Sequence, residues 1–144
     1  MRPDMEILRM YLPQLCAMVA LSYLVALCIL ATRISDLLSG RKTMSYYEDW
    51  DGTGASVSVM RPTRQLTNLF EFPVLFYLVV VLAVMIRSSD QWMPALCWAY
   101  VALRWAHAIS HIGFNRLWIR TPVFVLGQFV LLSTWARLVF ICFG

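Results

Sequence analysis

The sequence is poor in charged residues: only 14% of its 144 residues are Asp, Glu, Lys or Arg, whereas 60% are hydrophobic. Soluble domains contain about 25% charged residues, so this scarcity excludes an ordinary soluble enzyme and a disordered protein. Membrane-spanning helices of about 20 residues each would use most of the length and leave no room for a separate soluble domain. We therefore expect any functional site to be built from the helices and their connections.

Metal ligands and basic runs are also scarce. The four cysteines lie within apolar stretches without C-x-x-C spacing, which favours buried apolar residues over a disulfide framework. Only two histidines are present, His107 and His111. Their i, i+4 spacing can chelate a metal ion, but no third ligand is adjacent, so we expect no metal site. The net charge of +4 is not accompanied by a basic run on a soluble fold, so we expect no nucleic-acid partner.

Four long apolar stretches predict an all-α membrane protein with four transmembrane helices, residing in the lipid bilayer. The predicted spans cover residues 10–32, 64–86, 91–112 and 120–142, and a long polar connection covers residues 33–63. Consecutive spans predict an up-down-up-down bundle that forms a single domain over residues 1–144. Within the long connection we expect a short amphipathic segment at residues 44–50.

The distribution of basic residues predicts the orientation in the membrane. The first and third connections contain most of the Lys and Arg residues, so the positive-inside rule places these connections in the cytoplasm and both termini on the opposite side. Arg137 lies near the far end of the fourth span, where a long side chain can reach the interface, and we interpret it as an anchor. The aromatic surplus fits the belts that form at both interfaces.

Ionisable side chains within spans are informative, because each costs about 2.5–3.5 kcal/mol on insertion scales and is by default functional or paired. Helical spacing places Asn68 and Glu71 on one face, with Arg64 one turn earlier, and places Arg104, His107 and His111 on another. The second span starts, the third ends and the fourth starts on the same side of the membrane. We therefore expect one end of the bundle to hold Arg64, Asn68, Glu71, His107, His111 and Arg120.

Such a cluster has a net positive charge around a single carboxylate. It predicts an amphipathic anion as ligand, because arginine binds carboxylates bidentately and the start of the fourth span offers free backbone N–H groups to an anion such as a thiolate. An internal salt-bridge network is the alternative, in which Glu71 pairs with Arg104 or Arg120 and joins the helices. The spacing alone does not decide between the two.

Two stretches carry a family resemblance, RPTRQLTNLFEFPVLFY at residues 61–77 and RWAHAISHIGFNRLWIR at residues 104–120. They resemble the MAPEG family, the membrane-associated proteins in eicosanoid and glutathione metabolism, and in particular bacterial members with an NLFE-x-PVLFY motif. The resemblance implies a homotrimer, expected in the bacterial inner membrane, with glutathione as co-substrate between neighbouring subunits near the cytoplasmic face.

The resemblance also implies an activity and a set of site residues. The expected activity is a glutathione-dependent transferase or peroxidase that acts on lipophilic electrophiles, with Arg120 as the catalytic residue that stabilises the thiolate. Asn68 and Glu71 match glutathione-binding positions of the family, and Glu71 is expected to receive the ammonium group. The full set of expected glutathione-binding residues is Arg64, Asn68, Glu71, Arg104, His107 and His111.

Membership of such a family does not by itself establish catalysis. His111 stands where well-known transferase members have a tyrosine. A non-catalytic lipid-binding or scaffold protein of the same fold is therefore the alternative function. A small transporter is a weaker third hypothesis, because the first span contains no acidic residue and the chain has no obvious repeat.

Overall fold

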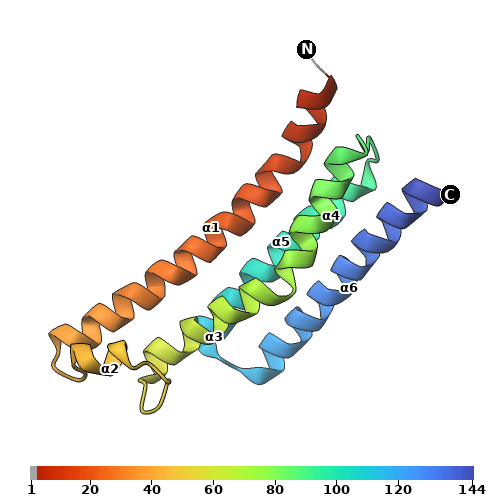
Figure 1. Ribbon diagram of the computed structural model, residues 1–144. Helices are drawn as coiled ribbons and strands as arrows, with labels where there is room; N and C mark the ends of the chain where they lie inside the picture. Colours follow the sequence, from red (N-terminus) through yellow and green to blue (C-terminus); the bar gives the residue numbers. More distant parts are fainter. Residues whose placement is uncertain (1–2) are drawn as a thin grey trace.

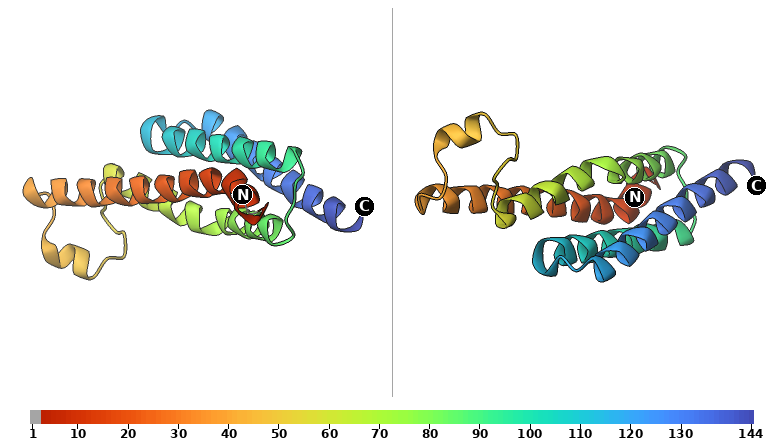
Figure 2. Two further views of the ribbon diagram at one scale, coloured as in Figure 1. Left: turned by 90° about the horizontal axis from the view of Figure 1, so that it is seen from above. Right: turned by 90° about the horizontal axis from the view of Figure 1, so that it is seen from below.

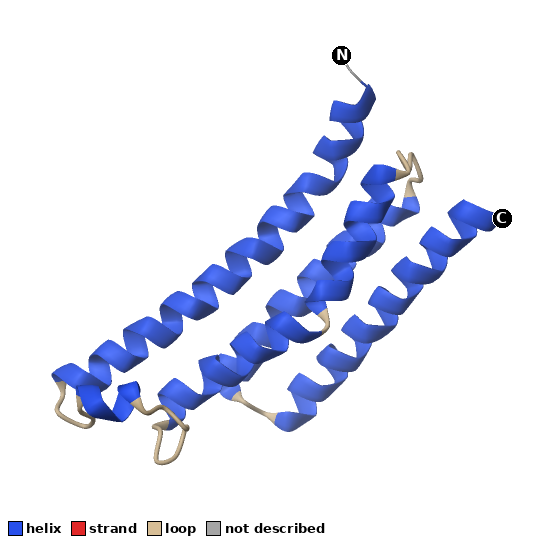
Figure 3. Ribbon diagram, in the orientation of Figure 1, coloured by secondary structure: helices blue, strands red, loops and turns tan. Residues whose placement is uncertain are grey.

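The computed structural model describes residues 3–144, and all regular secondary structure in this part of the chain is helical (Figure 3). The elements are α1 (Pro3–Leu38), α2 (Met44–Glu48), α3 (Val57–Glu71), α4 (Pro73–Met85), α5 (Trp92–Ile109), the π-helix η1 (Ser110–Phe114) and α6 (Leu117–Phe143). The chain runs away from its N-terminal end along α1, returns through α3 and α4, runs out again along α5 and returns along α6 (Figure 1). The all-α prediction is confirmed.

Three segments among the described residues are long and apolar enough to cross a membrane: Met5–Leu38, Val57–Met85 and Leu117–Phe143. α5 is not one of them, because Arg104 and His107 lower its mean hydropathy. It packs against α1 and α6, and its buried residues include both of these polar side chains. The fourth membrane crossing therefore remains a prediction.

Two helix boundaries differ from the predicted ones near the long connection. α1 continues to Leu38, six residues beyond the predicted end, because polar side chains are tolerated on a helix that extends past the apolar core of the membrane. α3 begins at Val57, seven residues before the predicted start. Its first two turns are amphipathic rather than uniformly apolar, with Val59 and Pro62 on the buried side. The connection between the two helices therefore covers residues 39–56, and it contains a helix, α2, within the predicted segment.

The predicted second span is divided into two helices by Pro73. A proline has no backbone N–H and its ring clashes with the preceding turn, so α3 ends at Glu71 and α4 starts afresh at Pro73. The N–H of Leu75 bonds instead to the carbonyl of Phe72 at 3.0 Å. The break is visible as a short non-helical segment in the middle of the molecule (Figure 3).

The apolar core lies between α1, α4 and α5. Phe76 of α4 stacks on Tyr100 of α5 with ring centroids 4.8 Å apart, and both side chains are fully buried. Met18 and Leu21 of α1 belong to the same buried cluster. This packing fixes α5 against its neighbours and thereby sets the positions of the polar side chains in the second half of that helix.

Arg137 lies near the C-terminal end of α6, where it forms an ion pair with Asp90 of the α4–α5 connection; its interpretation as an interfacial anchor stays a prediction. Its Nη2 lies 2.5 Å from Oδ2 of Asp90, and its Nε lies 3.2 Å from the same oxygen. The other carboxylate oxygen of Asp90 accepts the backbone N–H groups of Trp92 and Met93 at the start of α5. Asp90 therefore caps α5 and joins it to α6.

Asp90→Asn is expected to lower the melting temperature at neutral pH, because asparagine keeps the capping oxygen but loses the charge that pairs with Arg137. The hydrogen bond from Arg137 holds the pKa of the Asp90 carboxyl below its usual range. A lowered pKa stabilises the folded state above the unfolded-state value of about 3.9. The contribution disappears as the pH falls through the folded-state pKa. Thermal unfolding in detergent should show a difference between wild type and Asp90→Asn that vanishes in acid; a difference that persists there would contradict the ion-pair assignment.

Candidate functional site

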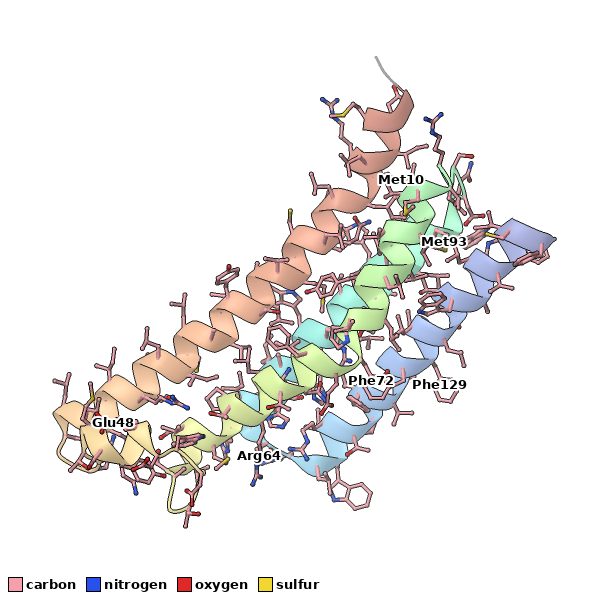
Figure 4. All side chains as sticks on the ribbon, viewed as in Figure 1. Met10, Glu48, Arg64, Phe72, Met93 and Phe129 are labelled. Atoms are coloured by element: carbon pink, nitrogen blue, oxygen red, sulfur yellow. The ribbon has the colours of Figure 1, made fainter. Side chains whose placement is uncertain are left out.

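A cavity opens between α3, the end of α5 and the start of α6. It has a volume of about 240 Å³, and we call it the inner cavity. Its lining residues are Arg64, Asn68, His107, His111, Arg120, Thr121 and Phe124. Five of the seven predicted site residues are thus brought together, from three separate segments of the chain. Figure 4 shows the first of them, Arg64, on α3 close to the start of α6.

A second cavity, which we call the outer cavity, adjoins the first. It has a volume of about 370 Å³ and shares Arg64, His111 and Arg120 with the inner cavity. Arg61 and Asn115 also line it, together with residues of the α2–α3 connection. No carboxylate lines either cavity within the described part of the chain. The combined site is therefore strongly cationic, which favours an anionic ligand.

Arg104 lies beside the inner cavity and holds one of its lining residues. Its guanidinium donates from Nε to the hydroxyl of Tyr100 at 2.8 Å and from Nη1 to Oδ1 of Asn68 at 2.9 Å. Because Oδ1 accepts this bond, the amide –NH₂ of Asn68 remains as a donor. The guanidinium carbon lies 5.3 Å from the ring centroid of Phe124, another lining residue. Arg104 is 1% exposed, so a full positive charge is buried here among neutral groups.

Two buried nitrogen atoms at the inner cavity have no hydrogen-bond partner among the described residues, Nη2 of Arg104 and Nδ1 of His111; Nε of Arg61, at the outer cavity, is a third. Buried polar nitrogens without partners are rare in folded proteins. Acceptor atoms of an anionic ligand would form hydrogen bonds with Nη2 of Arg104, which can only donate. This pair of atoms is the part of the site that fits a polar ligand most directly.

His107 joins α5 to the start of α6. Its Nδ1 lies 3.3 Å from the backbone carbonyl oxygen of Arg120, and because a carbonyl only accepts, Nδ1 carries the proton. The ring lies 5.4 Å from Phe124 and 5.7 Å from His111, centroid to centroid. Nε2 of His107 is not used by this bond. Both histidine rings line the inner cavity, so they contribute polar ring edges to it.

The π-helix η1 lies just before α6, whose first turn carries Arg120. The π-helix is followed by Asn115, whose φ of 46° is in the left-handed region that asparagine tolerates better than most residues. The Oδ1 of Asn115 accepts a hydrogen bond from Nη1 of Arg120 at 2.9 Å. Arg61 of α3 donates to the carbonyl of Gly113 at 3.1 Å and ties η1 to α3. These bonds orient Arg120 toward both cavities.

Glu71 is not part of either cavity in the described chain. It is exposed beside the break between α3 and α4, in a depression that it lines with Phe70, Phe72 and apolar residues of α4. Phe72 packs edge-on against Phe124, and this aromatic pair lies at the side of the inner cavity that faces the break. No ion pair joins Glu71 to Arg104 or Arg120 in residues 3–144. The predicted salt-bridge alternative is therefore wrong for these pairs.

Two residues that organise the site, Tyr100 and Asn115, were not predicted. Tyr100 accepts a hydrogen bond from Arg104 and lies four residues before it in α5. Residues with this spacing share one face of a helix, so helical periodicity could have indicated the contact. Asn115 lies between the predicted third and fourth spans, and its bond to Arg120 depends on the left-handed turn that follows η1. No pattern in the sequence indicated that turn.

A protein-family model described as the MAPEG family matches residues 13–140. The match covers nine-tenths of the chain, roughly, and includes every residue that lines the inner cavity as well as Arg104 and Glu71. No curated protein and no solved structure gives a significant match.

Proposed function

The chain belongs to the MAPEG family, and from this membership and the geometry of the inner cavity we propose that it is a glutathione-dependent transferase or peroxidase acting on lipophilic electrophiles. The observation that supports the proposal most is the inner cavity itself. It combines Arg64 and Arg120 with the amide donor of Asn68 and the ring edges of two histidines, and no carboxylate of the described residues lines it. Glutathione carries two carboxylates and a thiol that must ionise, so a cationic cavity suits its binding and its activation.

Arg120 is the residue proposed to act on the thiol. A guanidinium beside the sulfur lowers the thiol pKa, because it stabilises the thiolate and not the neutral thiol. The proton leaves to solvent, the thiolate sulfur forms a bond to the electrophilic carbon, and the leaving group departs with the bonding electron pair. Arg120 is partly exposed and lines both cavities, so it can contact a ligand in either.

We further propose that four helical segments cross the bilayer and that three subunits associate, with glutathione between neighbours. The position of Glu71 supports a shared site. Its side chain is exposed on the face beside the α3–α4 break and is surrounded by exposed apolar residues, including Phe70 at 66% and Val74 at 51%. A neighbouring subunit packed on this face would bring Glu71 to a second chain's ligand, where its carboxylate can receive an ammonium group.

The proposal is tested by turnover. Purified protein in detergent or lipid should consume glutathione thiol in the presence of a chlorodinitrobenzene-type electrophile, or reduce a lipid hydroperoxide with two equivalents of glutathione. If lipid copurifies with the protein but no thiol is consumed with either substrate, the non-catalytic lipid-binding or scaffold function is supported instead. Glu71→Gln should weaken glutathione binding if the site is shared between subunits and leave it unchanged if it is not.

A further inference from the structure

The last turn of α1 holds a buried carboxylate, Asp36, which is 1% exposed. Its Oδ1 accepts a hydrogen bond from Nε of Arg41 at 2.9 Å, and its Oδ2 accepts one from Oγ of Ser56 at 2.9 Å. The hydroxyl of Tyr47 lies 3.5 Å from the same Oδ2. Arg41 is near the beginning of the 39–56 connection and Ser56 is its last residue. One side chain therefore holds both ends of the connection to α1.

The connection between these two ends is folded around α2. The guanidinium of Arg33, on α1, lies 4.6 Å from the ring of Trp50 and 5.2 Å from the ring of Tyr47. The Tyr46 hydroxyl donates to the backbone carbonyl of Thr53 at 2.7 Å, which links α2 to the segment that follows it. Figure 2 shows α2 and its flanking loops projecting to one side of α1 and α3. Contacts thus run continuously from Asp36 through α2 to the residues around Thr53.

The far part of this connection forms a wall of the outer cavity. Gly52, Gly54 and Ala55 line that cavity opposite Arg61 and Arg120. Gly52 and Gly54 have φ values of +83° and +67°, which residues with a side chain rarely adopt, so this wall is largely bare backbone. A Cβ on Gly52 would also lie 3.3 Å from Cε of Met60. The wall can therefore approach a ligand closely.

We propose that Asp36 is a positioning residue of the site: it holds the 39–56 connection so that residues 52–55 complete the outer cavity around the anionic end of an elongated thiol. The inference rests on the proposed function and adds Asp36 to the residues that serve the proposed glutathione site. A thiol that fills only the inner cavity does not reach this wall. Asp36 therefore affects how well the enzyme discriminates glutathione from a short thiol, and it does not take part in the reaction at the sulfur.

Kinetics with two thiols provide the first test. Asp36→Asn should raise the KM for glutathione by about tenfold, because loss of a fixed wall misplaces the ligand's polar end, while kcat stays near the wild-type value. The kcat/KM for N-acetylcysteine, a short thiol, should not change. An equal loss with both thiols, or no loss with either, would overturn the proposal. Glu48→Gln is the matched control, since Glu48 is an exposed carboxylate on α2 in the same connection (Figure 4).

Limited proteolysis tests the same idea without a thiol. Trypsin cuts after Arg41 and Lys42, and Asp36→Asn should be cut there faster than wild type or Glu48→Gln, because local opening exposes the connection. Unchanged cleavage would overturn the proposal even if glutathione were not a substrate. Faster cleavage in a protein that never binds glutathione would instead refute the proposed function alone. Ser56→Ala removes only one of the bonds to Asp36 and should give intermediate effects if Asp36→Asn does not fold.

Discussion

Replacing Arg120 with alanine is expected to lower kcat for glutathione conjugation by about 100-fold or more, the usual effect of removing a group that stabilises developing negative charge. Arg120 lines both cavities and is proposed to stabilise the thiolate. Among the described residues, the Arg120 side chain forms one hydrogen bond, from Nη1 to the exposed Asn115. Removal of this side chain should therefore affect folding little. The rate is measured spectroscopically with a chlorodinitrobenzene-type electrophile at saturating glutathione, and folding is checked by thermal unfolding.

Arg116 offers a control of the same residue type. It is the residue immediately before α6, one turn before Arg120; it is exposed and lines neither cavity. Arg116→Ala should therefore keep near wild-type turnover, although it changes the net charge by the same amount. Arg120→Lys should lie between the two variants, since lysine restores the charge but not the planar fork. Wild-type turnover in Arg120→Ala, or an equal loss in Arg116→Ala, would contradict the role proposed for Arg120.

Replacing Arg104 with methionine is expected to abolish measurable glutathione binding with little change in melting temperature. Two opposing effects on stability lead to this expectation. Burying a guanidinium without an acidic partner lowers the free energy of unfolding by roughly several kcal/mol, and methionine removes that cost. The substitution also leaves Tyr100 and Asn68 without their bonds, at about 1–3 kcal/mol for each buried group. Because the two effects are of similar size, the net change in the free energy of unfolding should be small.

For glutathione binding, no opposing effect offsets the loss of Arg104. Without Arg104 the Asn68 amide loses the bond that orients it, and the site loses a buried charge next to Phe124. Calorimetry with glutathione and thermal unfolding should be measured on the same samples. Tyr100→Phe is the matched control, because it removes the bond from Arg104 to Tyr100 but leaves the bond to Asn68. A purely structural Arg104 would give the opposite pattern, with a large fall in melting temperature and retained binding in the molecules that fold.

Much of the inner cavity was predictable because it depends on two regular features. Helical periodicity places Arg64 and Asn68 on one face of α3, and the antiparallel course of consecutive helices brings that face to the same end as His107, His111 and Arg120. Helical periodicity acts over short stretches of sequence, and the antiparallel course follows from the order of the spans. The agreement between the predicted cluster and the cavity lining therefore reflects physics that the sequence displays directly.

The remaining features depend on contacts between residues that are distant in sequence. Glu71 shares the helical face of Arg64. However, the aromatic pair of Phe72 and Phe124 lies beside the inner cavity, and Glu71 lies outside that cavity. Asp36 was assigned to a polar connection, although it is buried at the end of α1 by partners up to 20 residues away. Periodicity cannot indicate such pairings, because they arise only when the connection folds back on the bundle.

Isothermal titration of glutathione into the purified wild-type protein tests most directly whether the cationic cavity at this end of the molecule binds glutathione. We expect saturable binding that is lost in Arg104→Met and retained in Arg116→Ala. If wild-type protein that is folded, as judged by thermal unfolding, gives no heat of binding, the cavity is not a glutathione site.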